Sequence, residues 1–380
     1  METTTEINLE NIEKVTSSRD RKEFLDFPYL HYKDDKYWVP PLYMEQKKLI
    51  DTKKNPFYLN ADIELFLARK NGKVVGRIAA IEDRRFNEYH DNKVGFFGFF
   101  ECINDQHIAG QLFQAAENWL KDRGLEAILG PSSPSMMDEI GVLVEGFDKY
   151  PSIMMPYSKS YYDKLIKNVG LGKVMDLYAF RVSQDTVNRE RIERAEAIVK
   201  RRMPNLKIRE VNLKDLNNEV HIIRDIFNKT WSENWGFIPL SKEEFDDLAK
   251  DLKTIVNTDF AHIAEVEGDP VAFSIALPDF NQALKHLNGK LLPFGIFKLL
   301  YYQSKISRIR TALMGVLPEY QGRGIDALMH KKAIDNGYEK GFHSSELGWV
   351  LETNTNMIRV AERLGAHREK TYRMYQRLLT

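Results

Sequence analysis

The stretch "VLPEYQGRGIDALMHKKA", residues 316–333, places two glycines and an arginine between an apolar run and a helical pattern. A strand that enters a helix through a glycine-containing loop presents free backbone N–H groups at the positive end of the helix dipole, which suits a pyrophosphate. Gly322 and Gly324 let the backbone approach oxygen atoms closely, and Arg323 can add charge-assisted hydrogen bonds. So short a pattern by itself favours a plain turn. The surrounding sequence therefore decides whether it predicts a turn or a pyrophosphate-binding loop.

That context is an internal repeat. Two β-type runs joined by a turn occupy residues 66–83, with Asn71-Gly72 at the turn, and the same pattern returns at 262–279. The offset between the hairpins is 196 positions, and the strand, helix and strand that follow each hairpin match at an offset of 217. The repeat predicts two mixed α/β domains of similar plan. The matching glycines are Gly72 and Gly268, Gly98 and Gly315, and Gly124 and Gly341.

The length of 380 residues agrees with two or more domains. We place the first at 1–183, where the first forty or so residues form an N-terminal extension packed on it. The charged helical pattern at 184–204, closed by a proline, predicts a helical linker, and the second domain follows at 205–380.

The composition excludes several classes of protein. Lysine plus arginine equals aspartate plus glutamate, 55 each, so no overall field recruits nucleic acid or an anionic surface. The single cysteine, Cys102, excludes an intrachain disulfide framework, and no histidine spacing indicates a metal site. The start lacks the features of a signal peptide and no apolar run is long enough to span a bilayer, so we expect a cytoplasmic protein without integral membrane association.

In this context the loop "QGRGID" resembles the Q/R-x-x-G-x-G/A pyrophosphate loop of the GNAT superfamily of acyl-coenzyme A-dependent N-acyltransferases. Downstream, "NTNMIRVAERLGA" resembles the N-x-x-A-x-x-x-Y-x-x-x-G-F helix of that family, with Asn354 at its asparagine and Gly365 at its glycine. The resemblance covers about 175 residues of the second half in order. The whole chain looks like bacterial tandem GNAT-like proteins: two mixed-sheet domains with an N-terminal extension.

The resemblance implies a reaction and a set of binding residues. An acetyl or other acyl group would pass from acyl-CoA to the primary amine of a small molecule or peptide, and backbone N–H groups would hold the carbonyl oxygen. The end of the fourth strand would pair with the pantetheine arm. The residues that the resemblance assigns to acyl-CoA are Gly315, Val316, Leu317, Gln321, Gly322, Arg323, Gly324, Ile325 and Asn354.

The first half does not keep the loop. The sequence "NDQHIAGQ" stands at that position, with His107 where Gly324 would be, so we expect that this copy does not bind coenzyme A in the same way. In the second half, Asp326 stands where the family has glycine or alanine. Because a carboxylate would repel a pyrophosphate at the same N–H groups, we expect its side chain to turn away toward backbone or a basic partner.

The catalytic groups are less clearly marked. The family's general acid, a tyrosine, falls on Ala361, so Tyr372 in the final strand, or Tyr375 beside it, could supply the proton or simply pack. The leaving thiolate can also depart unprotonated. For the base, Glu346 and Glu352 share one face if their strand is regular, and Glu352 could instead cap the following helix.

Two segments and two functional alternatives stay open. Residues 130–157 form a long loop that is either functional or covers the interface between the copies. Residues 278–306 hold about 21 extra residues, whose apolar part could line an acyl channel or touch a membrane, although burial on the domain is favoured. Besides an acyltransferase, the sequence is compatible with an aminoacyl- or acyl-carrier-dependent enzyme of the same fold, or with a catalytically silent sensor of coenzyme A. It does not indicate an oligomeric state.

Overall fold

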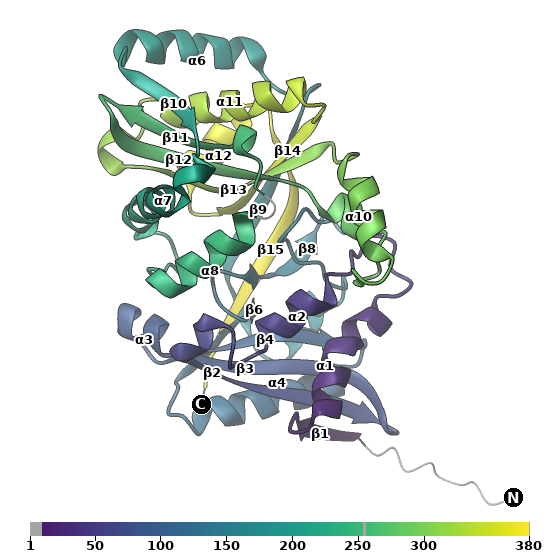
Figure 1. The fold of residues 1–380 in the computed structure, drawn as a ribbon. Coiled ribbons are helices and arrows are strands. Elements are labelled where there is room, and N and C mark those ends of the chain that lie inside the picture. The colour runs from purple at the N-terminus through teal and green to yellow at the C-terminus, as the bar shows by residue number, and fades with distance from the viewer. Residues whose placement is uncertain (1–9, 254–255, 380) are drawn as a thin grey trace, which may run out of the picture. The chain divides into compact units, whose positions relative to one another are not determined.

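The computed structural model describes residues 10–253 and 256–379 (Figure 1). It divides into two compact units, of which the first comprises Met1–Asp176, Asn288–Lys290 and Tyr372–Thr380. The second comprises Leu177–Leu287 and Leu291–Thr371. Among the described residues, no helix has both the length and the apolar character that crossing a bilayer requires.

The first unit is built on a mixed sheet. Its strands pair in the order β1, β2, β3, β4, β5 and the end of β15, and all pairs are antiparallel except β4 with β5. Helix α4 (Gln106–Lys121) packs its apolar face on β2 and β3, where Leu112 and Phe113 join Phe66 and Ile78 in one buried cluster. The strands are β1 (Glu10–Lys14), β2 (Ala61–Lys70), β3 (Lys73–Asp83), β4 (Val94–Cys102), β5 (Ala127–Gly130) and β15 (His367–Leu378).

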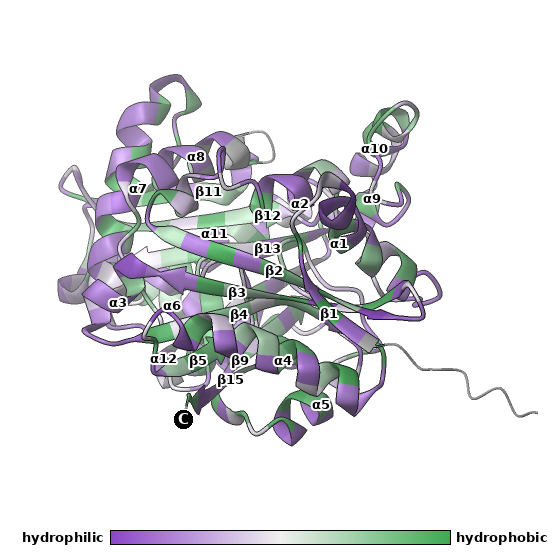
Figure 2. Cartoon of the chain, turned by 90° about the horizontal axis from the view of Figure 1, so that it is seen from below, coloured by the Kyte–Doolittle hydropathy of each residue, from purple (hydrophilic) through white to green (hydrophobic). Residues whose placement is uncertain are grey.

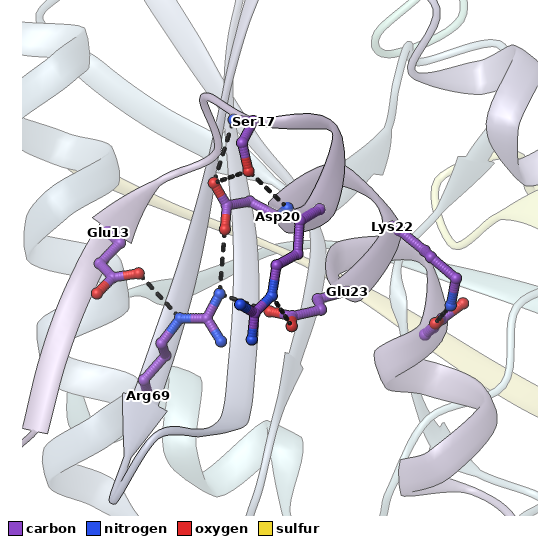
Figure 3. Close-up of polar contacts among 8 residues, drawn as sticks. Glu13, Ser17, Asp20, Lys22, Glu23 and Arg69 are labelled. Atoms are coloured by element: carbon purple, nitrogen blue, oxygen red, sulfur yellow. Dashed lines mark hydrogen bonds and ion pairs between the residues drawn. The ribbon is translucent and has the colours of Figure 1, made fainter.

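The N-terminal extension adds β1 to this sheet and packs α1 (Ser18–His31) on β2 and β3. Arg69 of β2 links β1 and α1, because its guanidinium donates to Glu13 of β1 at 2.9 Å and to Asp20 of α1 at 3.2 Å (Figure 3). Asp20 also forms a capping box with Ser17 at the start of α1. The remaining elements are α2 (Tyr43–Leu49), α3 (Arg84–His90), β6 (Ser132–Ser133), β7 (Glu139–Ile140), β8 (Val142–Glu145) and α5 (Tyr162–Asn168).

The second unit repeats this plan. Strands β10 to β14 and the end of β9 (Gly172–Ser183) form its sheet, and β13 pairs parallel with β14. Its strands are β10 (Leu206–Glu210), β11 (Ala261–Val266), β12 (Asp269–Pro278), β13 (Arg308–Val316) and β14 (Ser344–Leu351). Its helices are α6 (Arg189–Arg202), α7 (Leu216–Trp231), α8 (Lys242–Lys253), α9 (Asn281–Leu284), α10 (Gly295–Gln303), α11 (Ile325–Glu339) and α12 (Thr355–Arg363).

The internal repeat is confirmed. Hairpin β2–β3 and hairpin β11–β12 have the same register, and each has an irregularity at the same place, after Ala68 and after Ala264. Both hairpins are followed by an antiparallel strand, a helix and a parallel strand. Gly124 and Gly341, which follow the helices α4 and α11, both have a left-handed backbone, which favours glycine.

The predicted match of Gly98 with Gly315 was wrong. Gly315 lies opposite Phe273, whose counterpart in the first hairpin is Arg77, and Arg77 lies opposite Glu101 rather than Gly98. Glu101 is therefore the counterpart of Gly315, three positions from the glycine that the sequence match selects. Each glycine has its own steric cause: an added Cβ on Gly98 would lie 1.8 Å from a backbone oxygen of β6, and on Gly315 it would lie 2.5 Å from a side chain of α7.

The ends of the two repeats are exchanged. Residues of β9 from Leu177 onward pair with β14 in the second unit, although β9 follows the first copy in the chain. Residues Tyr375–Leu378 of β15 pair with β5 in the first unit, although β15 ends the second copy. The boundary predicted at residue 183 falls at the last residue of β9, and the predicted helical linker contains α6, which packs on α11.

Candidate active site

The glycine loop of the second unit is an open backbone turn. Eight residues, 317–324, connect β13 to α11, and Gly322 and Gly324 have φ angles of 70° and 89°. Gly324 is the N-cap of α11 and contributes no side-chain hydrogen bond. Within the described part of the chain, the N–H groups of Gly322, Arg323 and Gly324 donate to no backbone or side-chain acceptor. Three donors therefore meet at the positive end of the helix dipole.

The side chains of this loop leave its backbone accessible. Arg323 is exposed and its guanidinium lies 5.3 Å from the centre of the Tyr320 ring, an arrangement that keeps its N–H groups available. Ile325 is 1% exposed and belongs to the core between α11 and the sheet, so it anchors the helix start. An added Cβ on Gly324 would lie 2.8 Å from Val199 of α6, so the linker helix packs against the loop.

Strand β13 has an unpaired edge beside this loop. It pairs with β14 only over Arg308–Thr311, whereas its pairing with β12 continues to Val316. The carbonyl of Met314 accepts from Trp231 Nε1 at 3.0 Å, and that of Val316 accepts from Gln321 Nε2 at 3.0 Å. Because backbone direction alternates along a strand, the N–H groups of Met314 and Val316 face the same edge. On this edge β13 has no pairing strand beyond Thr311, and among the described residues neither N–H donates to an acceptor in a turn or loop.

The predicted binding residues thus divide by role. Leu317 uses both of its backbone groups within the protein, because its N–H donates to Val271 at 2.9 Å and its carbonyl accepts from Tyr320 at 2.8 Å. The backbone N–H and carbonyl of Gly315 point toward β12, because backbone direction alternates along the strand. Gln321 holds the loop closed through its side chain. Met314, which the sequence patterns did not select, has its N–H on the same side of the strand as that of Val316, and alternation along the strand is the signal that identifies it.

Comparison with known proteins places this geometry in a family. A model of the acetyltransferase (GNAT) family matches residues 220–366, which include the unpaired edge, the glycine loop and α12. The chain is 37% identical over 369 residues to Protein YghO of Escherichia coli (strain K12), a match covering 95% of this chain and 93% of that protein. It is 34% identical over 374 residues to a bacterial ceramide synthase of Caulobacter vibrioides, covering 96% of both.

The chain belongs to the acetyltransferase (GNAT) family. A solved tandem GNAT protein from the clavulanic acid biosynthesis pathway shares its fold, with a TM-score of 0.57 at 10% identity, and the match covers 98% of this chain and 99% of that one. The tandem fold inferred from the repeat is confirmed.

In this GNAT unit, Asp326 lies in the first turn of α11 and its charge acts on His330, one turn further along. Burial lowers the pKa of His330, and the Asp326 carboxylate opposes that shift. The His330 ring is 4% exposed and its Nε2 has no hydrogen-bond partner in the described structure. The expectation that the Asp326 side chain turns away from the loop stays a prediction.

Glu346 lies in a buried cluster of charges. It is fully buried on β14, and its Oε2 accepts from Arg181 of β9 at 3.0 Å. Arg181 also binds Glu369 at 2.8 Å. Lys370, fully buried on β15, has its pKa lowered to about 8 by burial, while Glu346 and Glu369 act in the opposite direction. Two cations balance two carboxylates, as in a structural ion cluster.

The expectation of a common face for Glu346 and Glu352 was wrong, because the strand is not regular. The register of β14 against β9 shifts between Leu347 and Val350, and Glu352 lies beyond the end of the strand, where it is half-buried. It does not supply the cap of α12, because the side chain of Asn354 accepts from the N–H of Met357 at 3.1 Å.

The position at which the family has its general-acid tyrosine is occupied by a buried alanine. Ala361 of α12 is 1% exposed and contacts the apolar cluster around β14. Tyr372 is fully buried on the part of β15 that belongs to the first unit, whereas Glu346 and Glu352 belong to the second. Tyr375 donates to Asp163 of α5 at 2.5 Å, and burial raises its pKa strongly. Tyr375 is thus a packed structural residue.

The first unit blocks the equivalent site with its own side chains. Its helix α4 follows β4 after only three residues, and Asp105 caps the helix by accepting from the N–H groups of His107 and Ile108. Asp105, rather than His107, is therefore the counterpart of Gly324. Cys102, the counterpart of Val316, donates its N–H to Tyr162 at 3.0 Å, and its carbonyl accepts from Tyr161 at 2.9 Å.

The loop at 130–157 also bonds to the edge of β4 in the first unit. Ser133 of β6 accepts from the N–H of Phe99 at 2.9 Å, on the edge of β4. The loop also lines a cavity with β4, in which the half-buried Glu101 accepts from the Tyr32 and Tyr162 hydroxyls at 2.7 and 2.6 Å. Burial raises the pKa of Glu101. The first unit therefore presents a polar interior where the second presents an open edge.

Proposed function

We propose that the chain transfers an acyl group from acyl-CoA to a primary amine, with the acyl-CoA bound by the second unit. One observation carries the proposal. The N–H groups of Met314 and Val316 lie on an edge of β13 with no pairing strand, and those of residues 322–324, at the helix start that follows, have no acceptor among the described residues. Unsatisfied donors in such a row are rare in folded proteins unless water or a ligand meets them.

The two groups of donors suit different parts of acyl-CoA. The N–H groups of residues 322–324, with Arg323 beside them, suit a pyrophosphate. The N–H groups of Met314 and Val316 suit the amide groups of an extended pantetheine arm or the thioester carbonyl oxygen, which gains negative charge during attack. In the reaction a C–N bond forms, the C–S bond breaks, the thiolate leaves, and the amine loses one proton.

For the base that takes this proton we propose Glu352. Of the three predicted catalytic residues, Glu346 and Tyr372 are fully buried, whereas Glu352 is half-buried at the end of β14, the strand that diverges from β13. A carboxylate at this end of the strand can accept an ammonium proton directly or through one water.

For the acceptor we propose a long-chain amine of the kind that a ceramide synthase acylates, taken together with a long-chain acyl-CoA. The support is the bacterial ceramide synthase of Caulobacter vibrioides, which is 34% identical over 96% of this chain. A likeness of this extent favours a related substrate class, and the full-length chain is the form to test.

The test is a measurement of free thiol released from acetyl-, octanoyl- and palmitoyl-CoA in the presence of sphinganine, a small primary amine or a peptide. We expect steady thiol release that requires both palmitoyl-CoA and sphinganine. Glu352→Gln should lower kcat by about 100-fold with little change in KM.

The exposed Glu319 provides a control, because Glu319→Gln removes a charge from the start of the glycine loop and should keep activity. Binding of acyl-CoA without thiol release for any amine would favour a coenzyme A sensor and contradict the proposal. Release with small amines alone would keep the acyltransferase but remove the long-chain acceptor.

A further inference from the structure

The segment between β12 and β13 has an unusual composition. Residues 285–306, "KHLNGKLLPFGIFKLLYYQSKI", contain four lysines and no aspartate or glutamate, in a chain whose positive and negative side chains are equal in number. The first copy of the repeat has no counterpart, because β3 and β4 are joined by a shorter connection that holds only α3. The segment is therefore an addition to the shared fold with a local positive charge.

Several large apolar side chains of this segment, in and just before α10, face the solvent. Helix α10 has no buried residue, and Figure 2 shows apolar residues along it. The expectation that the segment buries its leucines and phenylalanines on the domain is wrong for this helix. Five large apolar residues are exposed: Leu292 at 75%, Phe294 at 73%, Phe297 at 67%, Leu300 at 53% and Tyr301 at 58%. We call these five residues, with Lys298 and Lys305, the α10 surface.

Defined contacts hold α10 in place. The Tyr302 ring stacks on His286 with 3.8 Å between ring centres, and Lys298 Nζ donates to the carbonyl of His286 at 3.4 Å. At the start of the helix, the N–H of Ile296 donates to Leu291 at 2.7 Å. These contacts use Tyr302, Lys298 and the helix start, and they do not involve the phenylalanines. The α10 surface is thus preformed and needs no rearrangement to meet a partner.

We propose that the α10 surface docks on the headgroup region of a lipid bilayer that carries anionic lipids. Phenylalanine, leucine and tyrosine side chains gain free energy by entering the interface between headgroups and acyl chains. Lysines around them are attracted to anionic headgroups, and no acidic residue of the segment opposes this attraction. A helix of nine residues is too short to span the bilayer, so the contact is peripheral.

This docking is independent of acyl transfer, because it involves neither the glycine loop nor the β13 edge. It can be tested with the full chain and no coenzyme A, by co-sedimentation with vesicles of phosphatidylcholine alone or with about one third phosphatidylglycerol. We expect binding to the anionic vesicles that weakens in 0.5 M salt. The double variant Phe294→Ser, Phe297→Ser should bind at least ~10-fold more weakly. The variant Lys298→Glu, Lys305→Glu should lose the preference for anionic vesicles.

Leu59→Ser provides a matched control, since Leu59 is 70% exposed in the first unit and lies outside the α10 surface. It should bind vesicles like the wild type, and all variants should keep the wild-type thermal transition. The proposal is overturned if the wild type does not sediment with anionic vesicles, or if Leu59→Ser loses as much binding as the double phenylalanine variant. It is also overturned if the phenylalanines are required only for self-association, measured by sedimentation velocity, with no effect on vesicle binding.

Discussion

The two units share one fold and differ in what meets the edge of the strand before the long helix. In the first unit, Tyr161 and Tyr162 bind the backbone of Cys102, and Ser133 binds that of Phe99. In the second unit, the corresponding N–H groups of Met314 and Val316 lie on an edge of β13 with no pairing strand. The difference teaches that one fold can either satisfy these backbone donors with its own side chains or leave them open, and the proposed coenzyme A site depends on the open arrangement.

The same contrast appears at the start of the helix. The first unit connects strand and helix with three residues and caps the helix with the carboxylate of Asp105. The second uses eight residues and caps with Gly324, which has no side chain. A carboxylate and a pyrophosphate satisfy the same N–H groups, so a helix that carries its own carboxylate has no place for the ligand.

The largest expected effect comes from giving the second unit a carboxylate like that of the first. An added Cβ on Gly322 meets no atom within 4 Å, and its φ of 70° is one that asparagine and aspartate tolerate. We expect Gly322→Asp to weaken acyl-CoA binding by ~100-fold or more, because like charges would lie side by side. Gly322→Asn has nearly the same shape without the charge. Calorimetry should show a much smaller loss for it, and equal losses for both variants would exclude the electrostatic cause.

A smaller effect is expected from removing one donor of the open edge. Val316→Pro deletes an N–H on the edge of β13 that has no pairing strand, and proline is tolerated at a strand edge. We expect kcat/KM for acyl-CoA to fall by about 10- to 100-fold while the thermal transition moves little. Val316→Ala keeps the N–H and should remain close to wild type. A large loss of stability in the proline variant would show that this N–H is used within the fold.

Each unit carries a histidine that limits stability in acid: His262 is fully buried and His31 is half-buried. The pKa of His262 is lowered to about 4 by burial and then by Lys332, and burial also lowers that of His31 to about 4. The unfolded chain, with an ordinary histidine pKa near 6.5, therefore binds protons that the folded chain does not. Stability should be complete above pH ~6.5 and fall as the pH drops toward 4.

His262→Phe should remove on the order of 2 kcal/mol of this pH dependence and leave the part due to His31. Urea unfolding at several pH values between 4 and 7 measures the change. An unaltered slope in the variant would mean that His262 is not buried in its neutral form.

The smallest effect is expected in the first unit. Ser133→Ala frees the N–H of Phe99, and we expect a loss of ~1 kcal/mol in the free energy of unfolding. Acyl-CoA binding should not change, because the first unit does not carry the site. Thermal unfolding and calorimetry on the same variant separate the two results. A new, second binding event for acyl-CoA in Ser133→Ala would contradict the view that several contacts together block this edge.

The sequence by itself determined the features that depend on neighbouring residues. The hairpin at Asn71-Gly72, the repeat, the helix that ends at Gly124 and the glycine loop at residues 322–324 are all local patterns, and turn chemistry and periodicity are sufficient to predict them. The GNAT assignment follows from such patterns taken in order along the chain.

Only the tertiary structure decided the features that depend on pairing between distant segments. The register of β4 placed Glu101, and not Gly98, opposite Arg77, and the irregularity in β14 separated Glu346 from Glu352. The direction of each backbone N–H in β13 depends on β12, about 40 positions away, so the sequence does not show that the Leu317 N–H is used within the fold or that the Met314 N–H faces the other edge. A shift of one residue reverses which side of a strand a group faces, and no local pattern contains that information.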